Sequence, residues 1–241
     1  MHLQEVDDVE ANLCMRIQER QPNTLYKFKI CLIGDGGTGK TTFINRVLNG
    51  VFITKYFATQ GVVARPVTFQ IGDASENCFV KYVVWDTAGQ EKNSGLKDGY
   101  YIEAIAGFFF FDLTSRETMA NIPKYLADFQ NACGVPDPVM IVVANKSDLV
   151  KPDKKVDLNK LHTKIKSYNA EVIQMSAKNE HNFSLPFDRL TRILFNDPKL
   201  MTVAAIDFNP LNVNYDIFAG DAQTVNAPED MANLVPEEHY Y

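Results

Sequence analysis

The sequence predicts an α/β fold built on a mostly parallel, six-stranded sheet, with helices on both faces and one antiparallel edge hairpin. Short, continuous apolar runs such as 107–113 and 139–144 are typical of strands that are buried on both faces. Segments with helical spacing alternate with these runs, which favours parallel strands joined by helices. Residues 62–71 and 78–86 have the pattern of two strands separated only by 72–77, which predicts the hairpin.

The first predicted strand, 26–33, alternates between polar and apolar residues before it becomes continuously apolar. Helical spacing follows at 43–48, and Asn49-Gly50 provides residues that commonly end a helix. We expect a loop at 51–61. In the next strand Pro66 lacks a backbone N–H, so this strand should lie at an edge of the sheet.

The second half of the chain repeats the alternation of helix and strand. Ser115 is a suitable N-cap for the helix that follows the strand at 107–113. Pro186 is tolerated because it falls in the first turn of the last helix. The predicted elements are a helix carrying Met119, Ile122, Tyr125, Leu126 and Phe129, a strand at 139–144, a helix around 156–168, a strand at 171–175 and a helix at 185–195.

The chain of 241 residues is long enough for one large domain with extensions, and its 46% hydrophobic residues can form a sizeable core. We expect an N-terminal extension at 1–24, a globular domain at 25–197 and an acidic C-terminal tail at 198–241. Apolar residues at helical spacing between Leu3 and Ile17 fit a short amphipathic helix that packs on the domain or binds a partner, with disorder as the alternative.

The net charge of −6 resides in the C-terminal tail. From residue 198 onward seven acidic residues face one basic residue, Lys199, so the rest of the chain is balanced. A body without excess positive charge is a poor candidate for direct nucleic-acid binding. The four cysteines lack CxxC spacing, which favours reduced, buried thiols over disulfides or metal ligands.

No segment has the features of a membrane anchor. The longest apolar run, 104–111, is far shorter than the ~20 residues that a membrane helix requires. The start Met1-His2-Leu3 lacks the glycine needed for myristoylation, and 237–241 contain no cysteine for prenylation. We therefore expect a soluble, intracellular monomer.

Residues 34–42 match the phosphate-binding pattern G-x-x-x-x-G-K-[ST], between a predicted strand and a predicted helix. Glycines allow backbone N–H groups to turn toward phosphate oxygens, and the helix adds the positive end of its dipole. Lys40 can place its charge on the β- and γ-phosphates, and the Thr41 hydroxyl can bind Mg²⁺. The residues assigned to nucleotide binding here are Asp35, Gly36, Gly37, Thr38, Gly39, Lys40, Thr41 and Thr42. The motif predicts a nucleoside triphosphate but leaves the base open.

Asp86 follows the apolar end of its strand and begins the sequence Asp-Thr-Ala-Gly-Gln. A carboxylate at the end of a buried strand can reach Mg²⁺, directly or through water. Gly89 allows a backbone N–H to approach a γ-phosphate. The position of this motif after the phosphate-binding loop favours a functional role over an ordinary turn.

Two further strand ends supply the identity of the base. Asp148, in Asn-Lys-Ser-Asp, can accept hydrogen bonds from the N1–H and the 2-amino group of guanine, whereas adenine lacks that pair of donors. Asn145 can bridge loops, and the stem of Lys146 can lie along the purine. In Ser176-Ala177-Lys178 the N–H of Ala177 can donate to the guanine O6. Together these motifs predict a guanine-nucleotide site.

The four motifs, in this order and each at a strand end, resemble those of the Ras-like small GTPases over residues 25–197, and this resemblance implies the P-loop GTPase fold. Within that superfamily the chain is similar to the Ran family of nuclear transport GTPases. The missing lipidation site agrees, because this family works without a lipid anchor. The segments that carry the narrower resemblance are 34–43, 55–62, 85–92, 95–102, 182–187 and 197–198.

The resemblance implies roles for five residues. Thr59 would be the second hydroxyl on Mg²⁺, available only when the γ-phosphate is present. Phe52 would pack beside the guanine. Gln90 would orient the attacking water, and Tyr56 would hold Gln90. Lys40 and Mg²⁺ would neutralise the charge that develops on the phosphates.

Several features depart from the Ran pattern. The C-terminal run of acids is weaker, and Asn93 stands where the family has an aromatic residue that contacts a nuclear import carrier. Lys160, Lys164 and Lys166 form a reduced basic run, which fits a solvated helix face at least as well as a dock for the acidic tail. The hairpin loop at 72–77 is expected to be enlarged.

The resemblance implies a GTPase switch, in which GTP and Mg²⁺ order residues 52–61 and 87–101 and slow hydrolysis to GDP releases them. The implied partners are importin/exportin-type receptors, Ran-binding proteins, a GTPase-activating protein and a nucleotide exchange factor, and the implied location is the nucleus and cytoplasm. A Rab-type trafficking GTPase and a GTP-binding module without hydrolysis are the alternatives. The first would need a membrane anchor, and Thr59 and Gln90 argue against the second.

Overall fold

The computed structural model describes residues 4–6, 17, 20–52, 59, 61–87, 97–151 and 156–204 of the chain. Its strands are β1 (Gln4–Val6), β2 (Thr24–Gly34), β3 (Val62–Ile71), β4 (Cys78–Thr87), β5 (Ala106–Asp112), β6 (Val139–Asn145), β7 (Glu171–Gln174) and β8 (Thr202–Ala204). Its helices are α2 (Lys40–Asn49), α3 (Lys97–Tyr101), α4 (Arg116–Ala120), α5 (Ile122–Ala132), α6 (Leu158–Ile165) and α7 (Leu185–Leu194). Short 3₁₀ turns lie at Ala74–Glu76, Ser147–Leu149 and Lys166–Tyr168.

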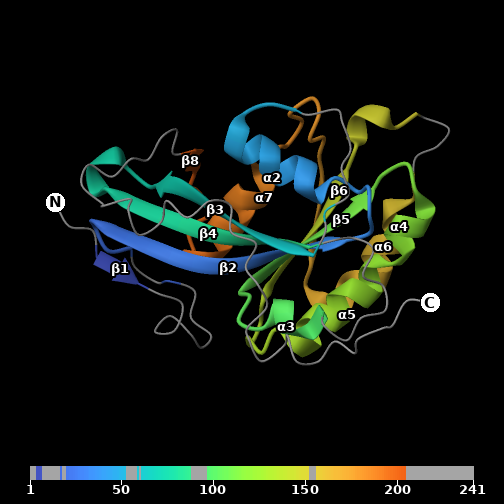
Figure 1. Ribbon diagram of the computed structural model, residues 1–241, viewed down its shortest axis with the longest axis horizontal. Coiled ribbons are helices and arrows are strands. Elements are labelled where there is room, and N and C mark those ends of the chain that lie inside the picture. Colours follow the sequence, from blue (N-terminus) through green and yellow to red (C-terminus); the bar gives the residue numbers. More distant parts are fainter. Residues whose placement is uncertain are drawn as a thin grey trace, which may run out of the picture.

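The described strands form one eight-stranded sheet in the order β7-β6-β5-β2-β4-β3-β8, with β1 beside β2 (Figure 1). The pairs β1–β2, β2–β4, β2–β5, β5–β6 and β6–β7 are parallel, whereas β3 is antiparallel to both β4 and β8. The predicted α/β class, mostly parallel sheet and antiparallel hairpin are therefore confirmed.

The predicted number of six strands is wrong, because β1 and β8 are added to the six predicted ones. Each has only three residues, too few to show a period in the sequence. β8 also takes the edge position that was expected for β3. It pairs with Phe69, Gln70 and Ile71 only, so Pro66 lies on the part of β3 that has no second neighbour among the described strands.

β5 lies inside the sheet and carries four consecutive phenylalanines, all fully buried. Because successive side chains of a strand point to opposite faces, Phe108 and Phe110 enter one core, whereas Phe109 and Phe111 enter the other. Residues of α2 and α7 complete the first core, and residues of α3, α5 and α6 complete the second. Figure 1 shows α2 and α7 on one side of the sheet and α3 and α5 on the other, so the predicted covering of both faces is confirmed.

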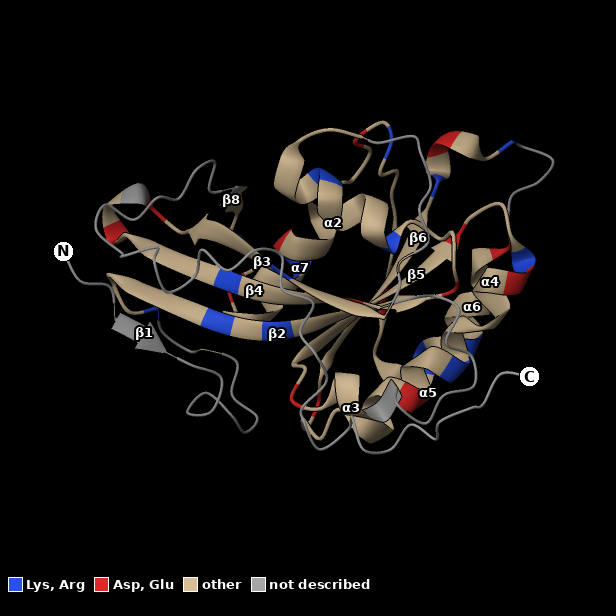
Figure 2. Cartoon of the chain, in the orientation of Figure 1, with Lys and Arg blue, Asp and Glu red and all other residues tan. Residues whose placement is uncertain are grey.

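β2 differs in burial between its two halves. The first half buries alternate residues, whereas the second half is buried throughout. The less buried face of the first half carries Lys27 and Lys29, and Figure 2 shows basic residues on β2 and on the adjacent β4. The ammonium of Lys29 lies 3.9 Å from the centroid of the Trp85 ring. The buried second half of β2 runs through the centre of the molecule and ends at Gly34, the first residue of the segment 34–42.

The predicted single helix after Ser115 is in fact two helices, α4 and α5, which meet at Asn121. Ser115 is the N-cap of α4, and its side chain accepts a hydrogen bond from the N–H of Thr118, as expected. Pro123 lies in the first turn of α5. Because proline has no N–H to donate to the preceding turn, a new helix begins where a continuous one was expected.

The ends of the chain differ from the sequence-based expectation. Gln4–Val6 form β1, so the predicted amphipathic helix does not include these residues, and 7–16 lie outside the described residues. Part of the predicted tail, Thr202–Ala204, forms β8, and 205–241 lie outside the described residues. None of the helices in the described ranges combines the length and the apolar character that a membrane crossing requires.

The described residues just before β2 pack on the domain. The N–H of Ile17 donates to the carbonyl of Leu194 at the end of α7 (2.7 Å). Arg20 forms ion pairs with Glu76 in the β3–β4 hairpin (3.2 Å) and with Asp197 after α7 (2.9 Å). This segment therefore joins the hairpin to the point where the C-terminal tail leaves the domain.

Phe187 is expected to be a major contributor to stability. It is 1% exposed, and its ring lies between 5.0 and 5.7 Å from those of Phe43, Phe69, Tyr82 and Phe108. Phe187→Ala should lower the free energy of unfolding by about 3–5 kcal/mol, because it leaves a cavity among these rings. Urea denaturation measures this change. Leu48→Ala, at a side chain that is 41% exposed, is the control; equal losses in the two variants would contradict the assignment of this core.

Candidate functional site

The predicted phosphate-binding loop connects the end of β2 to the first residue of α2. Gly34 has φ +143°, and a Cβ there would lie 2.2 Å from the carbonyl oxygen of Phe110. Gly39 has φ +98°, and a Cβ there would lie 2.3 Å from the amide nitrogen of Asn145. Glycine is therefore required at both ends of the loop, because any side chain would displace β5 or Asn145.

Lys40 lies inside this loop and is 5% exposed. Its ammonium donates hydrogen bonds to the carbonyl oxygens of Gly34 (2.7 Å) and Asp35 (3.0 Å). Burial lowers the pKa of Lys40 to about 8, although the nearby carboxylates of Asp86 and Asp35 act in the opposite direction. A phosphate placed at the loop would give this ammonium a charged acceptor in a position where water is largely excluded.

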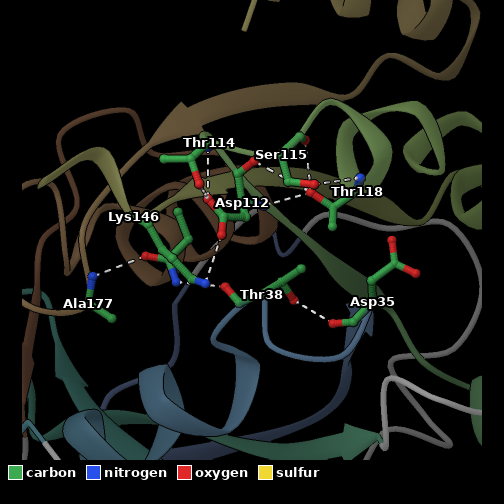
Figure 3. A network of polar contacts seen from close by, with 9 residues as sticks. Asp35, Thr38, Asp112, Thr114, Ser115, Thr118, Lys146 and Ala177 are labelled. Carbon is green, nitrogen blue, oxygen red and sulfur yellow. Dashed lines mark hydrogen bonds and ion pairs between the residues drawn. The ribbon is translucent and has the colours of Figure 1, made fainter. Parts of the chain in front are cut away.

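The side chain of Asp35 does not face the loop. Its carboxylate accepts hydrogen bonds from the amide of Asn121 (2.8 Å) and the hydroxyl of Tyr125 (2.9 Å), both on the α5 side. Figure 3 shows this carboxylate directed away from Thr38. The backbone carbonyl of Asp35 accepts from the Thr38 hydroxyl (2.8 Å). The side chain of Asp35 therefore anchors the loop to α5, and the role of Asp35 in nucleotide binding stays a prediction.

The three predicted ligands for Mg²⁺ come from three different elements. The hydroxyls of Thr41 and Thr59 lie 2.6 Å apart. Asp86 is completely buried near the end of β4, and neither of its carboxylate oxygens has a hydrogen bond of good geometry among the described residues, although the Thr41 hydroxyl is close enough to affect it. Burial raises the pKa of Asp86, whereas the Thr41 hydroxyl and the charges of Lys40 and Arg65 oppose this rise.

These residues fit a magnesium ion. Mg²⁺ prefers a few protein oxygens together with phosphate oxygens and water. A buried carboxylate without a partner is energetically unfavourable, and a divalent cation would compensate for it. The candidate site combines one carboxylate, Asp86, with the two hydroxyls of Thr41 and Thr59.

Asn145 joins the phosphate-binding loop to the loop that carries Ala177. Its side-chain N–H donates to the carbonyl of Thr38 (2.8 Å), and its side-chain oxygen accepts from the N–H of Ala177 (3.1 Å). Asn145 is 2% exposed, so both bonds are shielded from water. The N–H of Ala177, which we predicted to bind the guanine O6, thus has Asn145 as its partner here, and its contact with the base stays a prediction.

Asp148 is oriented by Ser176, a role that the sequence did not reveal. The Ser176 hydroxyl is fully buried and donates to one carboxylate oxygen of Asp148 (2.6 Å). The Ser176 oxygen itself accepts from the N–H groups of Lys178 (3.1 Å) and Asn179 (3.2 Å). The carboxylate that should read guanine is therefore held by a hydroxyl whose own orientation is determined by the following turn.

Asp112 is a site residue that sequence reasoning missed. It ends β5 directly opposite Asn145 in the register, and its carboxylate pairs with the ammonium of Lys146 (2.8 Å). Burial alone would raise the pKa of Asp112, but the bonds from Lys146 and Thr114 outweigh it and lower that pKa. Figure 3 shows the network that connects Asp112, Thr114 and Lys146. A signal was present, because Asp112 is a carboxylate at a strand end, as Asp86 is.

The structure gives only the exposure of three of the remaining predicted residues. Gly36 and Gly37 are exposed at the tip of the phosphate-binding loop, and Phe52 is half-buried after α2. Gly89, Gln90 and Tyr56 lie outside the described residues, so their predicted roles stay predictions.

Comparison with known proteins decides the family. A family model described as "Ras family" matches residues 29–196. The chain belongs to the Ras family. It is also similar to "GTP-binding nuclear protein GSP1" of Encephalitozoon cuniculi (strain GB-M1), with 45% identity over 212 residues, which are 88% of this chain and 97% of that protein. The predicted Ran-like small GTPase of the Ras family is thereby confirmed, and with it the P-loop GTPase fold, the guanine nucleotide as ligand and the class of enzyme.

Binding of nucleotide to this Ras-family site should be accompanied by proton uptake at Lys40. With a pKa of about 8, Lys40 is mostly neutral at pH 8.5. Phosphate oxygens favour the charged ammonium and raise its pKa, so binding of GDP at pH 8.5 should take up about 0.8 of a proton. Calorimetry in buffers of different ionisation enthalpy measures this number. Lys40→Arg, which stays charged, should take up none; equal uptake by both proteins would exclude Lys40 as the titrating group.

Proposed function

We propose that this protein is a guanine-nucleotide switch of nucleocytoplasmic transport, which binds GTP and GDP with Mg²⁺ and hydrolyses GTP slowly. One observation carries the proposal: the base-reading carboxylate Asp148 and the phosphate-binding loop belong to one hydrogen-bonded unit, through Ser176, Asn145 and Thr38. The relative described as a "GTP-binding nuclear protein" supports both the nucleotide and the cellular process.

Guanine selection is assigned to Asp148. Its carboxylate can accept from two donors on one edge of guanine, N1–H and the 2-amino group. Adenine presents no such pair and would leave this carboxylate without partners, at a cost of about 1–3 kcal/mol. Lys146 pairs with Asp112, and its stem would lie along the purine. Phe52 would pack beside the guanine.

The residues that would hold Mg²⁺ are Thr41, Thr59 and Asp86. When bound, this ion supplies positive charge next to the β- and γ-phosphates. Thr59 lies in the stretch that precedes β3, and its hydroxyl is within 2.6 Å of that of Thr41. A threonine that reaches the ion only in the GTP state gives the chain a means of reporting the γ-phosphate.

Hydrolysis is assigned to residues around the γ-phosphate. Gln90 orients the attacking water, and Tyr56 holds Gln90. The buried ammonium of Lys40 stabilises charge that develops on the phosphate oxygens, at a position from which water is largely excluded. Intrinsic turnover of this kind is slow, and an activating protein raises it by about 10⁵-fold in related enzymes.

We infer the partners from the same resemblance. Importin/exportin-type receptors and Ran-binding proteins would recognise the GTP form, and an activating protein and an exchange factor would control the cycle. The protein would act as a monomer in the nucleus and the cytoplasm, without direct contact to nucleic acid.

A receptor-binding experiment tests this function. Gln90→Leu should hydrolyse GTP far more slowly than wild type even with an activating protein, because the water is no longer oriented. Loaded with GTP, this variant should retain importin-class receptors from a nuclear extract, whereas the same variant loaded with GDP should not. Receptors bound equally in both states, or in neither, would contradict the proposed function; unchanged stimulated hydrolysis would contradict the role of Gln90.

A further inference from the structure

Arg46 is a buried arginine on α2 whose guanidinium reaches the loop that follows β7. The residue is 9% exposed. One terminal nitrogen donates to the carbonyl oxygens of Ala177 and of Lys178, the latter at 2.6 Å, and the other pairs with the carboxylate of Glu180. The guanidinium carbon lies 5.3 Å from the centroid of the Phe183 ring. α2 thus contacts the base-reading loop directly, in addition to the bridge that Asn145 makes between this loop and the phosphate-binding loop.

The two carbonyl bonds are the important part of this contact. Glu180 has 70% of its side chain exposed, so its ion pair with Arg46 is screened by water and contributes little. The carbonyls of Ala177 and Lys178 are instead held by a guanidinium that is largely shielded from solvent, where such charge-assisted bonds are strong. Arg46 therefore determines the orientation of two successive peptide groups.

The orientation of these two carbonyls also determines the orientation of the N–H groups in the same peptide groups. A peptide group is planar, so fixing the Ala177 carbonyl fixes the N–H of Lys178, and fixing the Lys178 carbonyl fixes the N–H of Asn179. Both of these N–H groups donate to the Ser176 oxygen (3.1 and 3.2 Å). Their donation leaves the Ser176 hydroxyl proton directed at Asp148, 2.6 Å away.

We propose that Arg46 is a positioning residue for base selection, which acts through the peptide groups of 177–179 and the Ser176 hydroxyl on the carboxylate of Asp148. This inference rests on the proposed function, because it assigns Asp148 to guanine. Arg46 is assigned no contact with base or phosphate; it holds the acceptor that reads the base and connects that acceptor to the helix that begins at Lys40. Base and phosphate are thereby recognised by a single rigid unit.

The experiment compares guanine with hypoxanthine, which keeps N1–H and O6 but lacks the 2-amino group. Affinities for GDP, IDP and ADP are measured for the full chain by displacement of a fluorescent nucleotide. In Arg46→Gln the carboxylate is no longer held in place, so the ratio of GDP to IDP affinity should fall about fivefold. Arg46→Lys lacks the planar guanidinium, which directs one nitrogen to both carbonyls while the other nitrogen pairs with Glu180, so it should restore only part of the ratio.

Two variants serve as controls. Arg189→Gln removes an ion pair with Glu171 that is about 40% exposed, and Glu180→Gln removes the exposed partner of Arg46; both should leave the GDP to IDP ratio within twofold of wild type. Urea denaturation of every variant separates loss of folding from loss of selectivity.

A weaker affinity for all three nucleotides with an unchanged GDP to IDP ratio would overturn the proposal, since a purely structural role predicts that result. If Arg46→Gln does not fold, the ratio in Arg46→Lys decides, and a wild-type ratio there overturns it. A wild-type protein that binds ADP as tightly as GDP would instead contradict the proposed function, so the two failures are distinguishable.

Discussion

The site depends most on the side-chain amide of Asn145. It is the one group that forms hydrogen bonds to both the phosphate-binding loop, at Thr38, and the base-binding loop, at Ala177, among the described residues. The amide is buried, so either bond, once broken, would leave a polar group without water as a substitute. Gly39 must lack a side chain because a Cβ would occupy the position of this amide. The geometry of the loop and the position of Asn145 therefore determine each other.

The parallel sheet explains why such a bridge exists. β2, β4, β5 and β6 end at the same edge, and the residues that follow them converge there. In the register Asp112 lies directly opposite Asn145, and Asp86 lies opposite Leu32, just before the loop. The sheet itself is held rigidly by its two aromatic and aliphatic cores. The carboxylate of Asp86, the amide of Asn145 and the Lys146–Asp112 ion pair therefore lie at the same edge of a rigid sheet. There each group can act on a different part of a nucleotide.

Much of this was predictable, and the exceptions have physical reasons. Long apolar runs and short motifs revealed the six main strands, the phosphate-binding loop and the family. The three-residue strands were missed because they are too short to show a period. Ser176, Asp112 and Arg46 lacked assigned partners because their contacts join residues that are distant in the sequence and depend on register. The bonds from Asn121 and Tyr125 to the carboxylate of Asp35 were not predictable either, since a motif identifies a loop but not the direction of each side chain in it.

The central claim is that base and phosphate are bound by one unit held together by Asn145. The rate of GDP dissociation from Asn145→Ala tests it most directly, with Asn159→Ala, at an exposed position of α6, as the control. Loss of both bridging bonds should accelerate dissociation by at least about tenfold, while Asn159→Ala should match wild type. Equal dissociation rates for Asn145→Ala and wild type would contradict the account.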